Sequence, residues 1–123
     1  MSGNHVYDTV AFDVRESTTM LFFAKTSEEG EIMDYLLIMR SVETDFEESL
    51  FIEVNEKQVD GKALLEEVGL IGNTLSLKFK EPVAELGGVT DLVLTFDETE
   101  TNLSNMEAGA FRVLGEFLKG GNA

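Results

Sequence analysis

Carboxylates are the side chains of this sequence with the greatest capacity for chemistry. The 123 residues include 24 Asp and Glu against 9 Lys and Arg, which gives a formal net charge of −15. Pairs of carboxylates hydrolyse glycosidic bonds, and groups of them bind divalent cations. The densest acidic runs contain Asp45, Glu47 and Glu48, and then Asp97, Glu98 and Glu100. Neither run has the turn glycine or the closing glutamate of a calcium-binding loop, so we predict solvated acidic surfaces and no metal site.

Other catalytic residue types are scarce. The single histidine, His5, lies close to the N-terminus, where little structure is expected to hold it. The chain has no cysteine and therefore no disulfide, no thiolate nucleophile and no thiolate metal site. The pairs Gly87-Gly88 and Gly120-Gly121 lack the lysine and the helix start of a phosphate-binding loop. We therefore predict no catalytic residue and no cofactor, and keep a carboxylate-dependent hydrolase or a metal-dependent enzyme as the enzymatic alternative.

Length and composition favour one folded domain that meets another protein. With a hydrophobic fraction of 43% and one proline, residues 1–123 suit a single domain, whose core we place over about residues 5–119. The negative charge repels nucleic-acid phosphates and anionic membranes, so a basic partner is favoured. The N-terminus lacks the features of a signal peptide, and no apolar run reaches the ~20 residues of a membrane span, so we expect a cytoplasmic protein.

Apolar periodicity predicts an α+β fold. Apolar runs bounded by turn signals indicate strands at residues 5–14, 18–26, 31–41, 49–55, 68–71, 74–80 and 92–96, with Pro82 ending the sixth. Residues 20–24 and 35–39 are apolar on both faces, which is typical of strands covered on both sides. We expect a curved, mostly antiparallel sheet of about six to seven strands, with one long C-terminal helix packed on one face. Sheet curvature and the segment 59–65, where Asp60 caps a short helical turn, are expected to cover the second face, with a second copy next and a partner as the remaining alternative.

The pattern changes to a helical period near the C-terminus. Ser104 and Glu107 form a capping-box signature, so the helix is expected to begin there and to stop at Gly120-Gly121. At about 100° per residue, its apolar arc contains Met106, Ala110, Phe111, Val113, Leu114, Phe117 and Leu118. Gly109 and Gly115 fall on the opposite side. Each costs about 1 kcal/mol relative to alanine, so packing must hold this helix together.

Negative charge is concentrated in the segment 28–60. Its only basic residues are Arg40 and Lys57, and its aromatic residues are Tyr35, Phe46 and Phe51. Solubility alone accounts for such charge as well as function does. The functional interpretation is an acidic patch that attracts a basic protein and holds it with aromatic anchors. The candidate partner-binding residues are Asp34, Tyr35, Glu43, Asp45, Phe46, Glu47, Glu48, Phe51, Glu53, Asn55 and Glu56.

Two stretches carry a family pattern, namely Tyr35-Leu-Leu-Ile-Met-Arg40 and, after the acidic loop, Phe51-Ile-Glu-Val-Asn-Glu-Lys-Gln58 with Gly61. Over roughly residues 18–119 the chain resembles the tenth numbered family of bacterial polymorphic-toxin immunity proteins. Met39 and Phe51 replace the glutamine and tyrosine of that family, so a polar role at those positions is absent here. The matching residues are Tyr35, Arg40, Glu53, Asn55, Gln58 and Gly61. Their roles are open between structure and binding, and one structural alternative is a pair between Arg40 and Glu53.

The resemblance implies a cytoplasmic protein that binds and neutralises a cognate bacterial toxin by direct contact, with no catalytic residues. Charge favours a basic toxin, and nucleases are the leading class. An acidic secretion chaperone for an effector is the alternative binder. Both a monomer and a homodimer are compatible with the sequence.

Overall fold

Two sheets and one long helix make up the structure, a computed structural model that describes residues 2–42 and 48–118. The strands are β1 (Ser2–Tyr7), β2 (Thr9–Arg15), β3 (Thr18–Thr26), β4 (Ile32–Val42), β5 (Glu48–Val54), β6 (Lys57–Asp60), β7 (Leu65–Ile71), β8 (Thr74–Val83) and β9 (Val89–Phe96). The helices are α1 (Gly61–Leu64) and α2 (Glu100–Leu114), with 3₁₀ turns η1 (Ala84–Leu86) and η2 (Gly115–Phe117). None of the helices described in these ranges has the length and apolarity needed to cross a membrane.

The strands divide into two sheets. Sheet A has the order β1-β9-β8-β7, with β1 parallel to β9 and the other pairs antiparallel. Sheet B has the order β2-β3-β4-β5-β6 and is antiparallel throughout. The predicted α+β class, the mainly antiparallel pairing and the long C-terminal helix are confirmed. The prediction of a single curved sheet of six to seven strands is wrong.

The chain changes sheets at Asp8, between β1 and β2. The Asp8 carboxylate accepts hydrogen bonds from Thr9 Oγ1 (2.7 Å), Thr26 N (2.8 Å) and Thr26 Oγ1 (3.0 Å). These bonds hold the pKa of the Asp8 carboxyl below its usual range, and the bond from Thr9 has the largest effect. The single strand predicted over residues 5–14 is wrong, because Asp8 ties the chain to the end of β3 and the two halves pair in different sheets.

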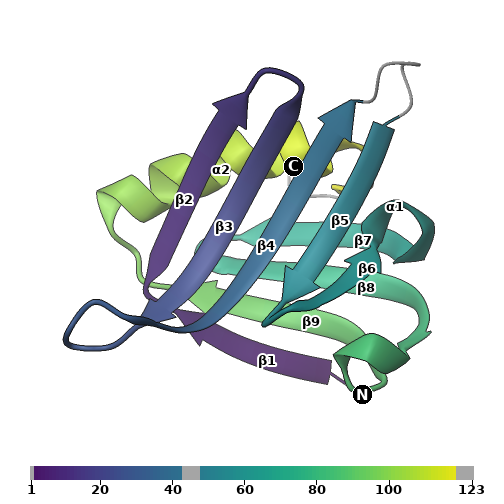
Figure 1. Cartoon of the computed structure of the whole chain (residues 1–123), viewed down its shortest axis with the longest axis horizontal. Coiled ribbons are helices and arrows are strands. Elements are labelled where there is room, and N and C mark those ends of the chain that lie inside the picture. The colour runs from purple at the N-terminus through teal and green to yellow at the C-terminus, as the bar shows by residue number, and fades with distance from the viewer. Residues whose placement is uncertain (1, 43–47, 119–123) are drawn as a thin grey trace.

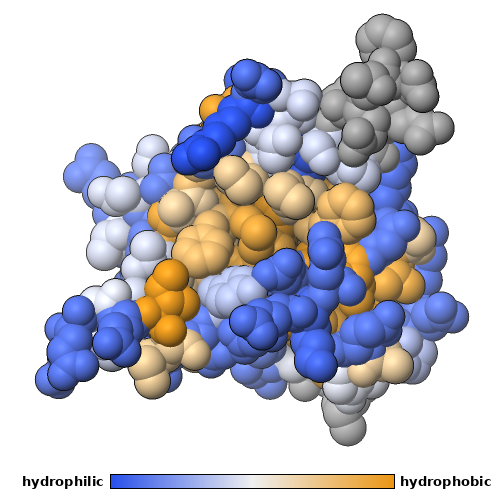
Figure 2. Space-filling model, viewed as in Figure 1, coloured by the Kyte–Doolittle hydropathy of each residue, from blue (hydrophilic) through white to orange (hydrophobic). Residues whose placement is uncertain are grey.

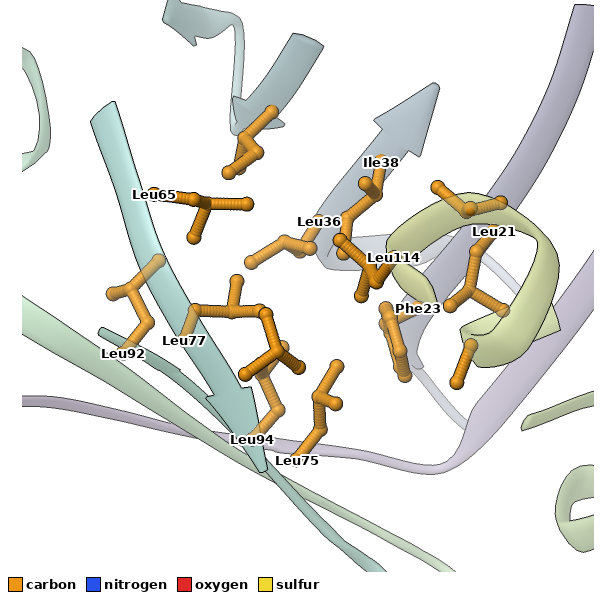
Figure 3. Close-up of a cluster of buried hydrophobic side chains, with 14 of the residues drawn as sticks. Leu21, Phe23, Leu36, Ile38, Leu65, Leu75, Leu77, Leu92, Leu94 and Leu114 are labelled. Atoms are coloured by element: carbon orange, nitrogen blue, oxygen red, sulfur yellow. The ribbon is translucent and has the colours of Figure 1, made fainter. Parts of the chain in front are cut away.

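Sheet A and α2 lie side by side against the same face of sheet B. Figure 1 shows sheet B in front, α2 behind its upper part and sheet A behind its lower part. Leu21, Phe23, Leu36 and Ile38 on this inner face of sheet B are fully buried. Figure 3 shows them gathered with leucines of sheet A and with Leu114 of α2. Burying one such side chain contributes about 1.5–3 kcal/mol, so both sheets and the helix depend on one shared core.

The turn and cap residues act largely as the sequence indicates. Gly30 (φ 85°) lies in the connection between β3 and β4, and Gly72 (φ 59°) begins the connection between β7 and β8. Glycine adopts this left-handed backbone without a steric penalty. The Asp60 carboxylate accepts a hydrogen bond from Ala63 N (3.1 Å), which confirms the predicted cap of α1.

The prediction that Pro82 ends its strand is wrong. Strand β8 continues to Val83, which pairs with Val89 of β9. The register between β8 and β9 is irregular between Lys78 and Val83. Proline cannot donate a hydrogen bond to a neighbouring strand. Where the pairing is irregular that bond is not required, so proline is tolerated there.

Helix α2 begins earlier and is turned differently than predicted. Thr99, rather than Ser104, caps it by accepting a hydrogen bond from Asn102 N (3.1 Å). Gly109 is buried against sheet B, whereas Phe111, predicted in the apolar arc, is 75% exposed. The helix approaches the sheet through its small residues, and this turns the bulky Phe111 outward.

Two asparagines of α2 complete the hydrogen bonding of the edge strand β2. Asn102, which is 4% exposed, accepts from Val10 N (2.9 Å) and donates to the carbonyl oxygens of Asp8 and Asp97 (both 2.9 Å). Asn105 Nδ2 donates to Val10 O (2.9 Å). These amides occupy the place that a further strand would take, so α2 shields this part of the sheet edge.

Arg40 joins sheet B to the end of α2. Its Nε donates to Val113 O (2.9 Å) and its Nη2 pairs with Glu116 Oε1 (2.5 Å). The last carbonyls of a helix lack intrahelical partners and carry the negative end of its dipole, so a guanidinium stabilises them. Arg40 points to the inner face and Glu53 to the outer face of sheet B, so the suggested pair between them is wrong.

Replacing Gly109 by alanine is expected to destabilise the protein. The added Cβ would lie 2.6 Å from Leu21 Cδ1 and 3.0 Å from Phe12 Cδ1, so side chains or the helix must move. Overpacking costs about 1–3 kcal/mol and the gain in helix propensity is about 1 kcal/mol, so we expect a net loss of up to about 2 kcal/mol in the free energy of unfolding, measured with urea. Gly115→Ala, where no atom lies within 4 Å of the new Cβ, is the control. Equal effects at the two positions would contradict the close approach.

Replacing Asn102 by alanine is expected to lower the free energy of unfolding by about 2–4 kcal/mol, because each buried group left without a partner costs about 1–3 kcal/mol. Hydrogen exchange should also accelerate at the Val10 amide, which loses its acceptor. Asn105→Ala is the matched control. It removes the hydrogen bond to the Val10 carbonyl oxygen and keeps the bond from the Val10 amide to Asn102. Unchanged protection of the Val10 amide in Asn102→Ala would show that this contact is not formed in solution.

Candidate functional site

The outer face of sheet B, turned away from α2 and sheet A, carries a continuous apolar surface. Along β3, β4 and β5 its half-buried side chains alternate with the fully buried ones of the inner face. Figure 2 shows hydrophobic side chains gathered over the middle of this face, with hydrophilic side chains around them. We call this surface the outer patch, and it consists of Met20, Phe22, Tyr35, Leu37, Met39 and Phe51.

Strand pairing brings these side chains together. Met20 lies opposite Met39, Met39 lies opposite Phe51, and Phe22 lies opposite Leu37. Directly opposite residues have Cβ atoms about 4.5–5.5 Å apart, so these rows are in contact. The rings of Phe22 and Tyr35 also stack, with centroids 5.9 Å apart. Contiguous exposed apolar surface of this kind marks interaction sites in soluble proteins.

Charged side chains border the outer patch on both long sides. On β2, Asp13 pairs with Arg15, with 2.6 Å between Oδ2 and Nε. On the other side stand Glu53 of β5 and Asp60 of β6. The Asp13–Arg15 pair is locally neutral, so the negative charge of the border lies on the side of β5 and β6, on a chain whose net charge is −15.

Hydrogen bonds fix the end of the outer patch nearest the turn between β5 and β6. The Tyr35 hydroxyl donates to the Glu53 carboxylate and accepts from Glu56 N (3.0 Å). Asn55 Oδ1 accepts from Tyr35 N (2.9 Å), and its Nδ2 donates to Asp34 Oδ1 (2.5 Å). Asn55 (φ 46°) and Glu56 (φ 74°) form the turn itself. Positive φ is unfavourable for glutamate, so these side-chain bonds help to hold a strained turn in place.

A hollow opens at each end of the outer patch. One, of about 280 Å³, is lined by Ile32, Met33, Tyr35, Asn55 and Glu56. The other, of about 240 Å³, is lined by Ser49, Phe51, Asp60, Lys62 and Ala63. Each combines an aromatic ring with a carboxylate. The first therefore suits a side chain that has an apolar stem and a cationic head, whereas Lys62 already brings a cationic side chain to the second.

The opposite outer surface, on sheet A, is chemically different. A hollow of about 530 Å³ there is lined by Glu67, Val68, Gly69, Ser76, Leu77, Lys78, Phe79, Thr90 and Asp91. Lys78 Nζ lies 3.4 Å from Glu66 Oε2 and 3.7 Å from Glu67 Oε1, so its positive charge is paired with two carboxylates of β7. The lining of this hollow is mixed, with Gly69, Ser76 and charged residues beside apolar ones, and it lacks the methionines of the outer patch.

Six of the residues predicted to bind a partner lie together at one side of the outer patch or within it, namely Asp34, Tyr35, Phe51, Glu53, Asn55 and Glu56. Glu43, Asp45, Phe46 and Glu47 lie outside the described residues, as does the side chain of Glu48.

Met20, Phe22, Leu37 and Met39 lie in the outer patch but are not among the candidate binding residues predicted from the sequence. The two-sided apolar pattern of residues 20–24 and 35–39 contains the signal. Its favoured interpretation is cover from within the fold, with a second copy or a partner as the alternatives. That interpretation is wrong for the segment 59–65, which packs on the inner face of sheet B. There, a Cβ added to Gly61 would lie 3.2 Å from side-chain atoms of Leu50 and Ile52.

Within residues 2–42 and 48–118, no group of three His, Asp or Glu side chains is placed to hold a metal ion. The run at Asp97, Glu98 and Glu100 leads into the start of α2. The family-pattern residues Arg40 and Gly61 make the structural contacts described above, whereas Tyr35 and Glu53 belong to the outer face.

Comparison of the sequence with protein-family models gives no match, and comparison with curated proteins gives no relative. The resemblance to immunity proteins therefore stays a prediction. A functional assignment depends on the geometry of the outer face of sheet B.

High pH is expected to destabilise the protein through both of its tyrosines. Burial, and secondarily the charge of Asp34, raises the pKa of Tyr7, and the hydrogen bond to Glu53 raises the pKa of Tyr35. Folding thus favours the protonated phenols. Their contribution is complete below about pH 10 and is lost as the pH rises, because the unfolded chain releases its phenolic protons first.

The measurement is urea unfolding between about pH 8 and 11 for the unmodified chain and for Tyr35→Phe. The phenylalanine variant should show a shallower loss of stability above about pH 10, because only Tyr7 still contributes. Identical pH dependence in the two proteins would rule out the raised pKa of Tyr35.

Proposed function

We propose that this protein is a non-enzymatic binder that captures a basic protein on the outer face of sheet B. We further propose that the partner is a cognate bacterial toxin, which is neutralised in the cytoplasm by direct contact. The observation that carries the proposal is the outer patch, an apolar centre with an acidic border on a chain of net charge −15.

The centre of the outer patch has the composition of a protein interface. Aromatic residues and methionine are enriched at interface cores, and this surface holds Phe22, Tyr35 and Phe51 with Met20 and Met39. Methionine side chains adapt to a partner's shape because they are flexible and polarisable. Burial of these side chains would supply the affinity, and truncating one that acts as a hot spot would cost at least about 2 kcal/mol.

Preorganisation supports the same proposal. The Tyr35 ring is held by its hydroxyl bonds to Glu53 and Glu56 and by its stacking on Phe22. A side chain that is already ordered loses little conformational entropy on binding, which otherwise costs about 0.5–1.5 kcal/mol per residue.

Charge supports a basic partner and, among toxins, a nuclease. Nucleases bind phosphate backbones with lysine and arginine, so their substrate surfaces are positive. A surface of opposite charge accelerates encounter and covers those same residues. Occupation of the substrate surface would be enough to neutralise the toxin without any reaction.

The resemblance to immunity proteins implies a toxin that is encoded beside this protein. The proposal is therefore tested with the product of the neighbouring gene, which is titrated against the full chain and co-expressed with it. We expect a complex and rescue from toxicity. Leu37→Asp should weaken the complex by at least about tenfold, equivalent to 1.4 kcal/mol, because it places a charge at the centre of the outer patch. Added salt should slow association, since exposed charges steer the encounter.

The matched control is Val93→Asp. It makes the same kind of change on a central strand, β9, but on the outer face of sheet A. A complex that is equally weakened by both variants, or unaffected by Leu37→Asp, would exclude this face. Absence of both complex and rescue would exclude the toxin as the partner.

A further inference from the structure

The dimensions of the outer patch fit one α-helix. The patch spans β3, β4 and β5, and the two flanking strands β3 and β5 are about 10 Å apart. Along β4 the outer patch runs from Tyr35 to Met39, about 13 Å, and the adjoining hollow with Met33, which is 65% exposed, extends the apolar surface to about 20 Å. A helix with its side chains is about 10–12 Å wide, and about 13 residues cover 20 Å.

The borders of the patch restrict what can cover it. In proteins the apolar face of a sheet is covered by helices or by another sheet. A second sheet would need apolar residues across several more strands, but β2 contributes Asp13 and Arg15 here and β6 contributes Gln58 and Asp60. A narrow apolar strip with charges along both sides matches a helix with one apolar stripe and charged flanks.

Charge determines which kind of helix fits. Glu53 and Asp60 stand along one side, and Asp13 with its partner Arg15 along the other. A second copy of this chain would bring the same carboxylates and a further charge of −15, so self-association through this face is opposed. Lysine or arginine on the flanks of the helix would meet these carboxylates.

The two hollows provide anchor points at a helical spacing. Tyr35 borders one hollow and Phe51, which lies opposite Met39, borders the other. From Tyr35 to Met39 the strand advances about 13 Å, which is between two and three helical turns. A cationic side chain on one turn would place its stem on the Tyr35 ring and its head beside Glu56. An apolar side chain about two turns further along would contact the Phe51 ring in the other hollow, where Lys62 is already present.

We propose that the partner element bound by the outer patch is an amphipathic α-helix with an apolar stripe flanked by lysine or arginine. This inference rests on the proposed function, because it names the part of the partner that makes contact. It adds a property that charge and hydrophobicity alone do not imply, namely that the partner must present a helix.

The test uses a designed peptide of about 18 residues, long enough to form a helix, with leucine along one stripe and lysine on both flanks. A peptide of the same composition in scrambled order is the control. Binding to the full chain is followed by fluorescence anisotropy, and peptide helicity by circular dichroism. We expect the helical peptide to bind at least about tenfold more tightly than the scrambled one and to gain helicity when bound.

Variants locate the binding site. Leu37→Asp should reduce peptide affinity by at least about tenfold and Val93→Asp should leave it unchanged. If Leu37→Asp fails to fold, Phe51→Ala removes one ring of the outer patch without burying a charge and should also weaken binding. Equal affinity for the two peptides, or no effect of the folded outer-patch variants, overturns the inference.

Competition separates this inference from the proposed function. If the neighbouring-gene product binds through the outer patch and the helical peptide does not displace it, the binding function stands and the helix is excluded. If the helical peptide binds the outer patch but the neighbouring-gene product forms no complex, the toxin is excluded and the helix-binding face stands.

Discussion

The side-by-side packing of α2 and sheet A against the inner face of sheet B is the contact on which the rest of the structure depends. It buries Leu21, Phe23, Leu36 and Ile38 completely and requires a glycine, Gly109, where the helix meets β3. Sheet A and α2 both cover the inner face of sheet B, and neither covers its outer face. The outer face of sheet B is therefore left half-exposed over the described residues, although its strands are apolar on both sides. The candidate site follows from this unequal cover of the sheet.

Directional polar contacts fix how α2 lies on the sheet. The burial of Met106, Val113 and Leu114 attaches the helix to the core, but apolar burial has no preferred direction and does not by itself fix the position of the helix. Asn102 and Asn105 bind both backbone groups of Val10 near one end of the helix, and Arg40 binds Val113 O at the other. Buried hydrogen bonds are costly to leave unmade, so these three side chains select one position of the helix. That position turns Phe111 outward and Gly109 inward, contrary to what periodicity alone suggests.

Local sequence signals predicted most elements, and long-range contacts explain the errors. The α+β class, the hairpins at Gly30 and Gly72 and the Asp60 cap follow from neighbouring residues, and they could be predicted. The change of sheet at Asp8 could not, because it depends on bonds to Thr26, 18 residues away. For the site, the acidic and aromatic residues from 34 to 56 were predicted from composition. Met20, Phe22, Leu37 and Met39 were missed, because an apolar strand face has the same sequence pattern whether its own fold or a partner covers it.

The net negative charge of the chain limits self-association through the apolar outer patch. An exposed apolar face across three neighbouring strands, β3, β4 and β5, would favour self-association in a neutral protein. A net charge of −15 opposes the approach of a second copy and, by the same field, attracts a basic protein. Glu53 acts at close range as well, because its bond from Tyr35 holds an aromatic ring of the patch in place. The acidic composition thus both limits which molecules can reach the apolar surface and helps to shape it.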